Sequence, residues 1–268
     1  MHYRISRKTI CKQDGLVRTF RNGRLAALIV PILAAAPCAH AQGRLPPDFV
    51  SLRDVDATIE QDMRYAGPKN FTGAPLPGYG AAECVLRRDT AAALKMVQDD
   101  LRGSGMSLKV YDCYRPQRAV NAMASWASAP EDNATKRFYP RRDKQKLFAE
   151  GWISPRSRHS AGIAVDLTLV PVGSVTPRFD PRSRPLGDCD TAQRAPDNSL
   201  DMGTGFDCFS SKSYTKSNAI SSAARDNRAQ LAEAMSRAGF RNYFREWWHF
   251  ELRGGAAAVT YDVSIGAR

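Results

Sequence analysis

The stretch "SRHSAGIAVD", residues 157–166, contains His159 and Asp166 on either side of Gly162. A second stretch, "REWWHFE", contains His249. Two imidazoles and one carboxylate suit a catalytic zinc site, which takes three protein ligands and leaves a fourth position for water. Asp166 also lies among strongly apolar residues, where an unpaired carboxylate is costly and needs a cationic partner. The two stretches together predict one zinc ion per chain, bound by His159, Asp166 and His249.

A possible catalytic base lies close to the third ligand, because Glu246 precedes His249 by three residues. A carboxylate beside a metal can take a proton from water and pass it to a leaving amine. Each of these residues also fits an ordinary role: a surface histidine, an aspartate paired with an arginine, or a glutamate at a strand end. Beyond residue 41, however, His159 and His249 are the only histidines, and this favours the metal site.

Hydrophobic periodicity indicates the elements that must position these residues. Leu94, Val97 and Leu101 share one face of a predicted helix that Asp89 or Thr90 can cap and Gly103 ends. Helices and strands occur in blocks, which predicts an α+β fold. We expect a single domain with a central antiparallel sheet flanked by helices, and the zinc site in a cleft on the sheet. Further helices are predicted over 116–127 and 221–239, and strands over 107–114, 163–169, 240–244 and 247–253, with another possible near 58–64.

The N-terminal segment has the pattern of a secretory signal peptide. Residues 1–24 carry seven basic residues and one acid, and the apolar run "LAALIVPILAAA" precedes "CAHAQ". We therefore predict a cleaved signal over 1–41 and a mature domain over 42–268, exported to the periplasm or cell envelope. An uncleaved anchor and a lipid attached at Cys38 are alternatives. Pro31 interrupts the short apolar run and Pro37 follows it, which argues against the anchor. Stable membrane insertion after cleavage is not expected.

The net charge gives little support for a nucleic-acid partner. The formal charge is +12, of which the predicted signal contributes about half. The remaining Lys and Arg residues are scattered, without a basic run that includes aromatic residues. Binding to nucleic acid is therefore not expected.

Four cysteines follow the predicted signal: Cys84, Cys113, Cys189 and Cys208. None forms a C-x-x-C pair, which argues against a zinc–thiolate site. An even number in an exported protein favours two disulfides, for which three pairings are possible. We favour Cys84–Cys113 and Cys189–Cys208, because the second would close part of the polar excursion over 171–217. Four reduced, buried cysteines remain the alternative.

Several stretches together resemble one known family, the zinc D-alanyl-D-alanine dipeptidases involved in vancomycin resistance and cell-wall dipeptide recycling. These stretches are "SRHSAGIAVDLTL", "EWWHFEL", "YDCYRPQRAV", "DMRYAGPKNFTG" and "MGTGFD". The resemblance runs from about residue 50 to residue 263. It implies the same three metal ligands and Glu246 as the base. It also implies that Arg115 stabilises the developing oxyanion, and a buried salt bridge with Asp112 or another acid is the alternative role for that arginine.

The resemblance also implies how substrate is bound. Ser157 and Asp207 match positions that receive the free amino group of a small D-amino-acid dipeptide, and Tyr65 matches a residue that lines the site. The excursion over 171–217 can form a lid. A leader and cysteines distinguish this chain from the cytoplasmic resistance enzymes, which favours dipeptide recycling in the envelope.

Three other functions stay open from the sequence. A D,D- or L,D-carboxypeptidase acting on peptidoglycan stem peptides would share the metal site. A non-catalytic, zinc-stabilised cell-wall binding domain would need neither Glu246 nor Arg115. A metal-free structural protein would use none of these residues together. The oligomeric state is left open.

Overall fold

A five-stranded sheet carries most of the candidate site. The structure is a computed structural model that describes residues 43–178, 180, 185–255 and 259–266, so the predicted signal peptide and Cys38 lie outside the described residues. β5 pairs antiparallel with β4 on one side and with β7 on the other, and β6 pairs antiparallel with β7. The strands, in sheet order, are β2 (Glu60–Gln61), β4 (Met106–Asp112), β5 (Ala164–Pro171), β7 (His249–Leu252) and β6 (Phe240–Asn242).

The prediction of an antiparallel sheet is wrong at one edge, because β2 runs parallel to β4 with Glu60 opposite Lys109. Between these strands the chain passes through β3 (Val85–Arg87) and the helix α2 (Arg88–Arg102). A long connection that includes a helix allows the chain to enter the next strand in the same direction. The sheet is therefore mixed, within an α+β fold.

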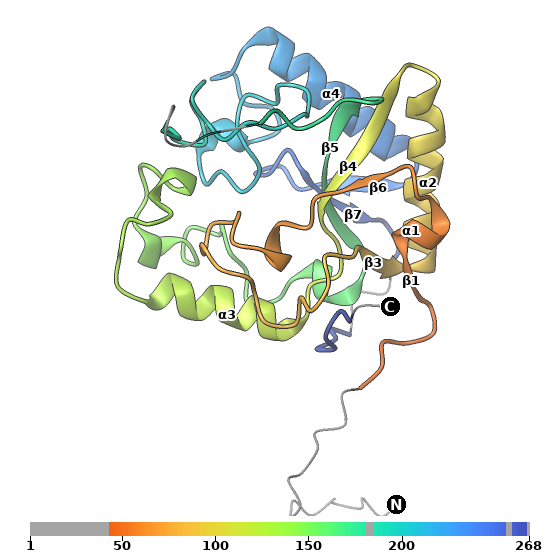
Figure 1. The fold of residues 1–268 in the computed structure, drawn as a ribbon, viewed down its shortest axis with the longest axis horizontal. Coiled ribbons are helices and arrows are strands. Elements are labelled where there is room, and N and C mark those ends of the chain that lie inside the picture. The colour runs from red at the N-terminus through yellow and green to blue at the C-terminus, as the bar shows by residue number, and fades with distance from the viewer. Residues whose placement is uncertain (1–42, 179, 181–184, 256–258, 267–268) are drawn as a thin grey trace, which may run out of the picture. The chain divides into compact units, whose positions relative to one another are not determined.

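Two long helices pack together beside the sheet (Figure 1). α2 contacts β4 and α4 (Ser222–Arg237), and α4 also contacts β5 and β6. Leu94, Val97 and Leu101 are buried as their spacing predicts, and Gly103 follows the last residue of α2. The predicted cap is wrong: Asp89 and Thr90 lie in the first turn, and the N-cap is Arg87.

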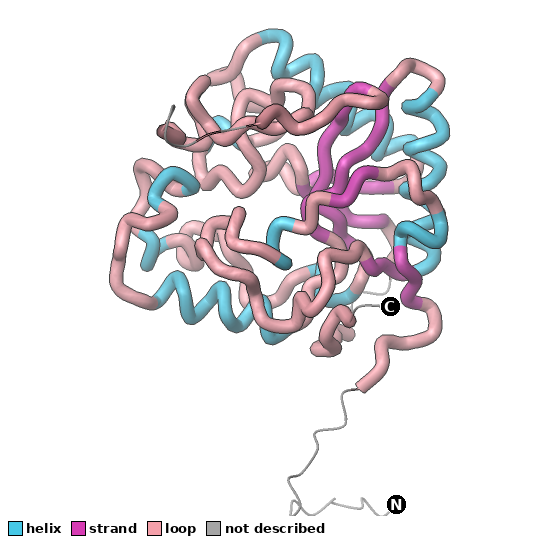
Figure 2. Tube along the Cα trace, in the orientation of Figure 1, coloured by secondary structure: helices cyan, strands magenta, loops and turns pink. Residues whose placement is uncertain are grey.

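The rest of the described chain consists mainly of loops and short helices, as Figure 2 shows. The helix that follows Pro116 is confirmed as α3 (Gln117–Ser128). No helix in the described part of the chain is long and apolar enough to span a bilayer. The remaining elements are β1 (Phe49–Ser51), which pairs antiparallel with β3, α1 (Leu52–Val55), and the 3₁₀ helices η1 (Arg64–Ala66), η2 (Lys136–Phe138), η3 (Lys144–Lys146), η4 (Arg158–Ala161) and η5 (Ser211–Ser213).

Both favoured disulfides are present. Cys84 is bonded to Cys113, and Cys189 is bonded to Cys208. The first joins the segment before β3 to the residue that follows β4. The second closes a loop within the polar excursion. Disulfides of this kind form and persist in oxidising compartments, so the pairing supports folding in such an environment.

A buried ionic cluster attaches the polar excursion to the sheet. The Lys109 side chain, in the middle of β4, is fully buried and forms an ion pair with Asp197. The Tyr111 hydroxyl donates to the same carboxylate at 2.9 Å, and Arg64 forms a second ion pair with it at 2.9 Å. A buried charge is tolerated only when it is paired, so this cluster holds the start of the segment that leads to Asp207.

Candidate metal centre and active site

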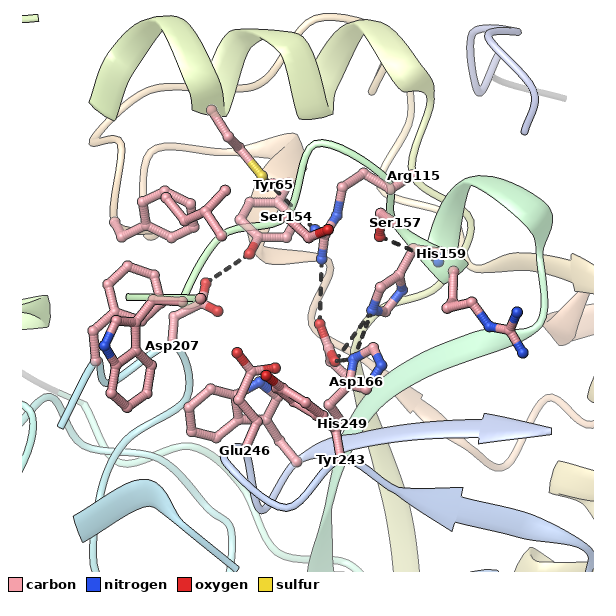
Figure 3. A pocket seen from close by; sticks show the side chains of 18 of the residues that line it. Tyr65, Arg115, Ser154, Ser157, His159, Asp166, Asp207, Tyr243, Glu246 and His249 are labelled. Carbon is pink, nitrogen blue, oxygen red and sulfur yellow. Dashed lines mark hydrogen bonds and ion pairs between the residues drawn. The ribbon is translucent and has the colours of Figure 1, made fainter. Parts of the chain in front are cut away.

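His159, Asp166 and His249 converge at one end of the sheet (Figure 3). One potential ligand atom from each residue lies within 4.8 Å of the other two. Asp166 Oδ1 is 3.3 Å from His159 Nε2 and 2.9 Å from His249 Nδ1. Asp166 lies on β5 directly opposite His249 on β7, and His159 lies on η4 just before β5. The structure thus brings together all three predicted ligands.

Neighbouring acceptors orient both imidazoles. His159 Nδ1 is 2.7 Å from the carbonyl oxygen of Cys113, so it donates there and leaves Nε2 free as a ligand. His249 Nε2 is 3.5 Å from Glu251 Oε1, which leaves Nδ1 facing Asp166. The sequence did not reveal the first partner, because every residue carries a backbone carbonyl.

The electrostatics of the three residues favour a cation between them. Burial lowers the pKa of His249, but hydrogen bonds to Asp166 and Glu251 outweigh it and raise that pKa to about 10. Burial raises the pKa of Asp166, but His159 and His249 outweigh it and lower that pKa below its usual range. The cluster therefore stabilises a positive charge, and two nitrogen donors and one carboxylate fit a divalent metal.

The turn between η4 and β5 requires glycine. Gly162 has φ +73°, and a Cβ built there would lie 2.7 Å from Cζ of Phe49. That ring cannot easily move, because it packs edge-on against Tyr114 and Tyr261 at centroid distances of 5.6 and 5.3 Å. Glycine at this position therefore places His159 and Asp166 on the same side of the cavity.

Gly162→Ala should lower the free energy of unfolding by about 1–3 kcal/mol, from the strained φ and the clash with Phe49. Gly173→Ala is the matched control, since Gly173 has φ +77° with nothing within 4 Å of the added Cβ. Chemical denaturation should show a smaller loss for the control. Equal losses would mean that the Phe49 contact does not matter.

Glu246 lies in the turn before β7, and its carboxyl lines the same cavity. Its backbone N–H donates to Tyr243 O at 3.0 Å, and its carbonyl accepts from the His249 N–H at 3.2 Å. Burial raises the pKa of the Glu246 carboxyl to about 7. A group with a pKa near neutrality can both accept and return a proton, which suits general acid–base chemistry.

Arg115 follows β4 and lines the cavity opposite Glu246 (Figure 3). It forms an ion pair with Asp112 at 2.8 Å, as the alternative interpretation of this arginine proposed. The same guanidinium also lies 3.4 Å from Asp166 and packs over the Tyr65 ring at 4.9 Å. The pair with Asp112 thus holds the guanidinium beside the metal ligands, and it does not exclude a role in the site.

Asp207 and Tyr65 form a separate polar group in the cavity. The Tyr65 hydroxyl donates to Asp207 Oδ2 at 2.8 Å, and both residues are buried. Burial, together with the charge of Asp166, raises the pKa of Asp207 well above its usual range. A buried carboxyl of this kind gains most from a cation placed beside it, so a substrate ammonium would suit this position.

Ser157 also lines the cavity. Its hydroxyl accepts the His159 N–H at 3.3 Å, as the N-cap of η4. Figure 3 shows Ser157 beside His159 and Asp207 on the other side of the cavity. Both side chains line the same cavity, and their shared contact with the substrate's amino group stays a prediction.

The cavity has a volume of about 260 Å³ and is suited to a small ligand. Two residues of the polar excursion over 171–217, Asp207 and Phe209, line this cavity. Aromatic residues supply much of the wall, although single aromatic residues of this kind have no recognisable pattern in the sequence. They are Phe71, Trp152, Phe209, Tyr243 and Trp248.

A profile of the family described as D-Ala-D-Ala dipeptidase matches residues 47–177 and 188–265, which include every site residue described above. The chain belongs to this family. It is 34% identical over 206 residues to a D-alanyl-D-alanine dipeptidase of Enterococcus faecium, covering 76% of this chain and 91% of that protein. It is 34% identical to a D-alanyl-D-alanine dipeptidase of Streptomyces coelicolor, and the match covers 80% of this chain and 96% of that protein. It is 31% identical to a D-alanyl-D-alanine dipeptidase of Escherichia coli, and the match covers 78% of this chain and 87% of that protein. Members of this dipeptidase family are metallopeptidases, in keeping with the cluster of His159, Asp166 and His249.

Proposed function

We propose that this protein hydrolyses the dipeptide D-alanyl-D-alanine and that His159, Asp166 and His249 hold a zinc ion. One observation carries the proposal: the three potential metal ligands, Glu246 and Asp207 line the same cavity. Zinc is the divalent ion that best suits two imidazoles and one carboxylate in a hydrolytic site. When bound, it polarises the scissile carbonyl and lowers the pKa of water.

The surrounding side chains perform the remaining steps. Glu246 takes a proton from the attacking water and delivers it to the nitrogen of the leaving D-alanine. Arg115 donates charge-assisted hydrogen bonds to the oxyanion that develops at the carbonyl. Asp207, held by Tyr65, receives the free ammonium of the substrate. Recognition of that ammonium would select a dipeptide over a longer stem peptide, whose residue at this position has no free amino group.

The leader and the disulfides support a place of action outside the cytoplasm. We propose that residues 1–41 are removed on export and that residues 42–268 act in the periplasm. There the enzyme would degrade D-alanyl-D-alanine released from peptidoglycan. A role in lowering a cytoplasmic pool, as resistance requires, does not fit this location.

The proposal is tested by measuring amine release from three substrates, each with and without a metal chelator. D-Ala-D-Ala should be cleaved, whereas L-Ala-L-Ala and N-acetyl-D-Ala-D-Ala should not, and the chelator should abolish cleavage. Cleavage of the N-acetylated substrate at a comparable rate would indicate a carboxypeptidase. Cleavage that survives complete metal removal would exclude the metal mechanism.

A further inference from the structure

Each disulfide adjoins one half of the site. Cys113 directly follows Asp112, the partner of Arg115, and Cys208 directly follows Asp207. Cys84, Cys113 and Cys208 are completely buried. A disulfide that served only to stabilise the fold could lie anywhere in the chain, so this placement points to a more specific effect.

The Cys84–Cys113 bond lies beside the metal ligands. The carbonyl of Cys113 accepts from His159 Nδ1 at 2.7 Å. Regular pairing between β4 and β5 is interrupted between Val110 and Asp112 and resumes at Asp112, so Cys113 lies at the end of the paired segment, just beyond this irregularity. Cys84 is itself anchored, since its carbonyl accepts from the Leu52 N–H at 2.9 Å. The bond thus fixes the acceptor that orients a metal-binding imidazole.

The Cys189–Cys208 bond lies beside the ammonium-binding carboxyl. Asp207 has φ +56°, a conformation that few residues other than glycine adopt, and no strand or α-helix occurs between residues 185 and 210 to impose it. The Cys189 carbonyl accepts from the Gly205 N–H at 2.8 Å, and the Cys208 carbonyl accepts from the Ser213 hydroxyl at 2.6 Å. The bond therefore closes the loop between Cys189 and Cys208, which carries Asp207 at the cavity.

We propose that the two disulfides are positioning devices with separate tasks. Cys84–Cys113 positions His159 and so sets the affinity for the metal. Cys189–Cys208 positions Asp207 and so sets the affinity for the substrate's ammonium. The second part rests on the proposed function, which assigns Asp207 to that group, whereas the first part can be tested by metal binding alone.

The test compares two matched double variants, Cys84→Ala/Cys113→Ala and Cys189→Ala/Cys208→Ala. The first should bind zinc about 10- to 100-fold more weakly in competition with a chromogenic chelator, as expected when a partner of a ligating histidine is disturbed. The second should retain zinc affinity and raise KM for D-Ala-D-Ala about 10- to 100-fold, with kcat at saturating zinc changed much less. Its preference for D-Ala-D-Ala over propionyl-D-Ala, which has no ammonium, should fall by a similar factor.

A purely structural role predicts a different result. If both variants lose stability but share the same zinc affinity and the same KM as the parent, or if both change the two parameters equally, the proposal is wrong. If a variant does not fold, the same comparison is made on the folded parent protein after partial reduction. Alkylation followed by mass spectrometry identifies which disulfide has opened, and zinc retention and KM are measured on the same sample. Absence of dipeptide cleavage by the parent would overturn the proposed function and leave the zinc measurement to decide the first part.

Discussion

Replacing Glu246 with glutamine should lower kcat for D-Ala-D-Ala by about 10²- to 10⁴-fold, the usual contribution of a general base. The amide has nearly the same shape as the carboxyl but cannot accept a proton from water. Glu246 is not among the three potential metal ligands, so the variant should bind zinc as the parent does. Steady-state kinetics and metal analysis of the same preparation measure both quantities.

Glu233→Gln makes the same chemical change and is a suitable control, because Glu233 is exposed on α4 and does not line the cavity. It should leave kcat unchanged. Full activity in Glu246→Gln would rule out Glu246 as the base. If this variant lost hydrolysis but kept every biological effect of the parent, the protein would act as a non-catalytic cell-wall binding domain.

Replacing His249 with alanine should reduce bound zinc from one ion per chain to background and abolish hydrolysis. Only His159 and Asp166 would remain, and two protein ligands do not make a catalytic zinc site. Equilibrium dialysis followed by elemental analysis measures the occupancy, and circular dichroism shows whether the variant is folded.

Tyr243→Phe provides the comparison for the histidine variant. The Tyr243 ring lies 6.0 Å from the His249 ring and lines the same cavity, but it supplies no atom to the three-residue cluster. It should therefore retain the metal. If His249→Ala still bound one zinc ion tightly, the proposed ligand set would be incorrect.

The sequence predicted well whatever depends on local pattern. The alternation around His249 and the apolar run that contains Asp166 each indicate a strand, and these strands are neighbours in the sheet. Helical periodicity places Leu94 and Leu101 on one face of α2, and both side chains are buried as expected. Local spacing was sufficient here because each element presents its residues in a geometry set by its own backbone.

The features that the sequence did not reveal depend on distant partners. β2 falls within the possible strand near 58–64, but its parallel direction follows from the path of the chain before β4. Lys109 looks out of place in an apolar strand until Asp197 is seen beside it, 88 positions away. Ser157 could be assigned only by resemblance, and the structure shows its hydroxyl capping η4. Long-range pairing of this kind has no signal in a single sequence.

The position of Cys113 beside His159 also implies an order of events during maturation. In a newly synthesised chain, before oxidation, both thiols of this pair are free, and thiolates compete strongly for zinc with imidazole and carboxylate. Forming the Cys84–Cys113 bond removes these competitors and at the same time constrains the residue whose carbonyl accepts from His159 Nδ1. Oxidation should therefore come before metal loading, and at the proposed site of action the supply of oxidant would govern how quickly active enzyme accumulates.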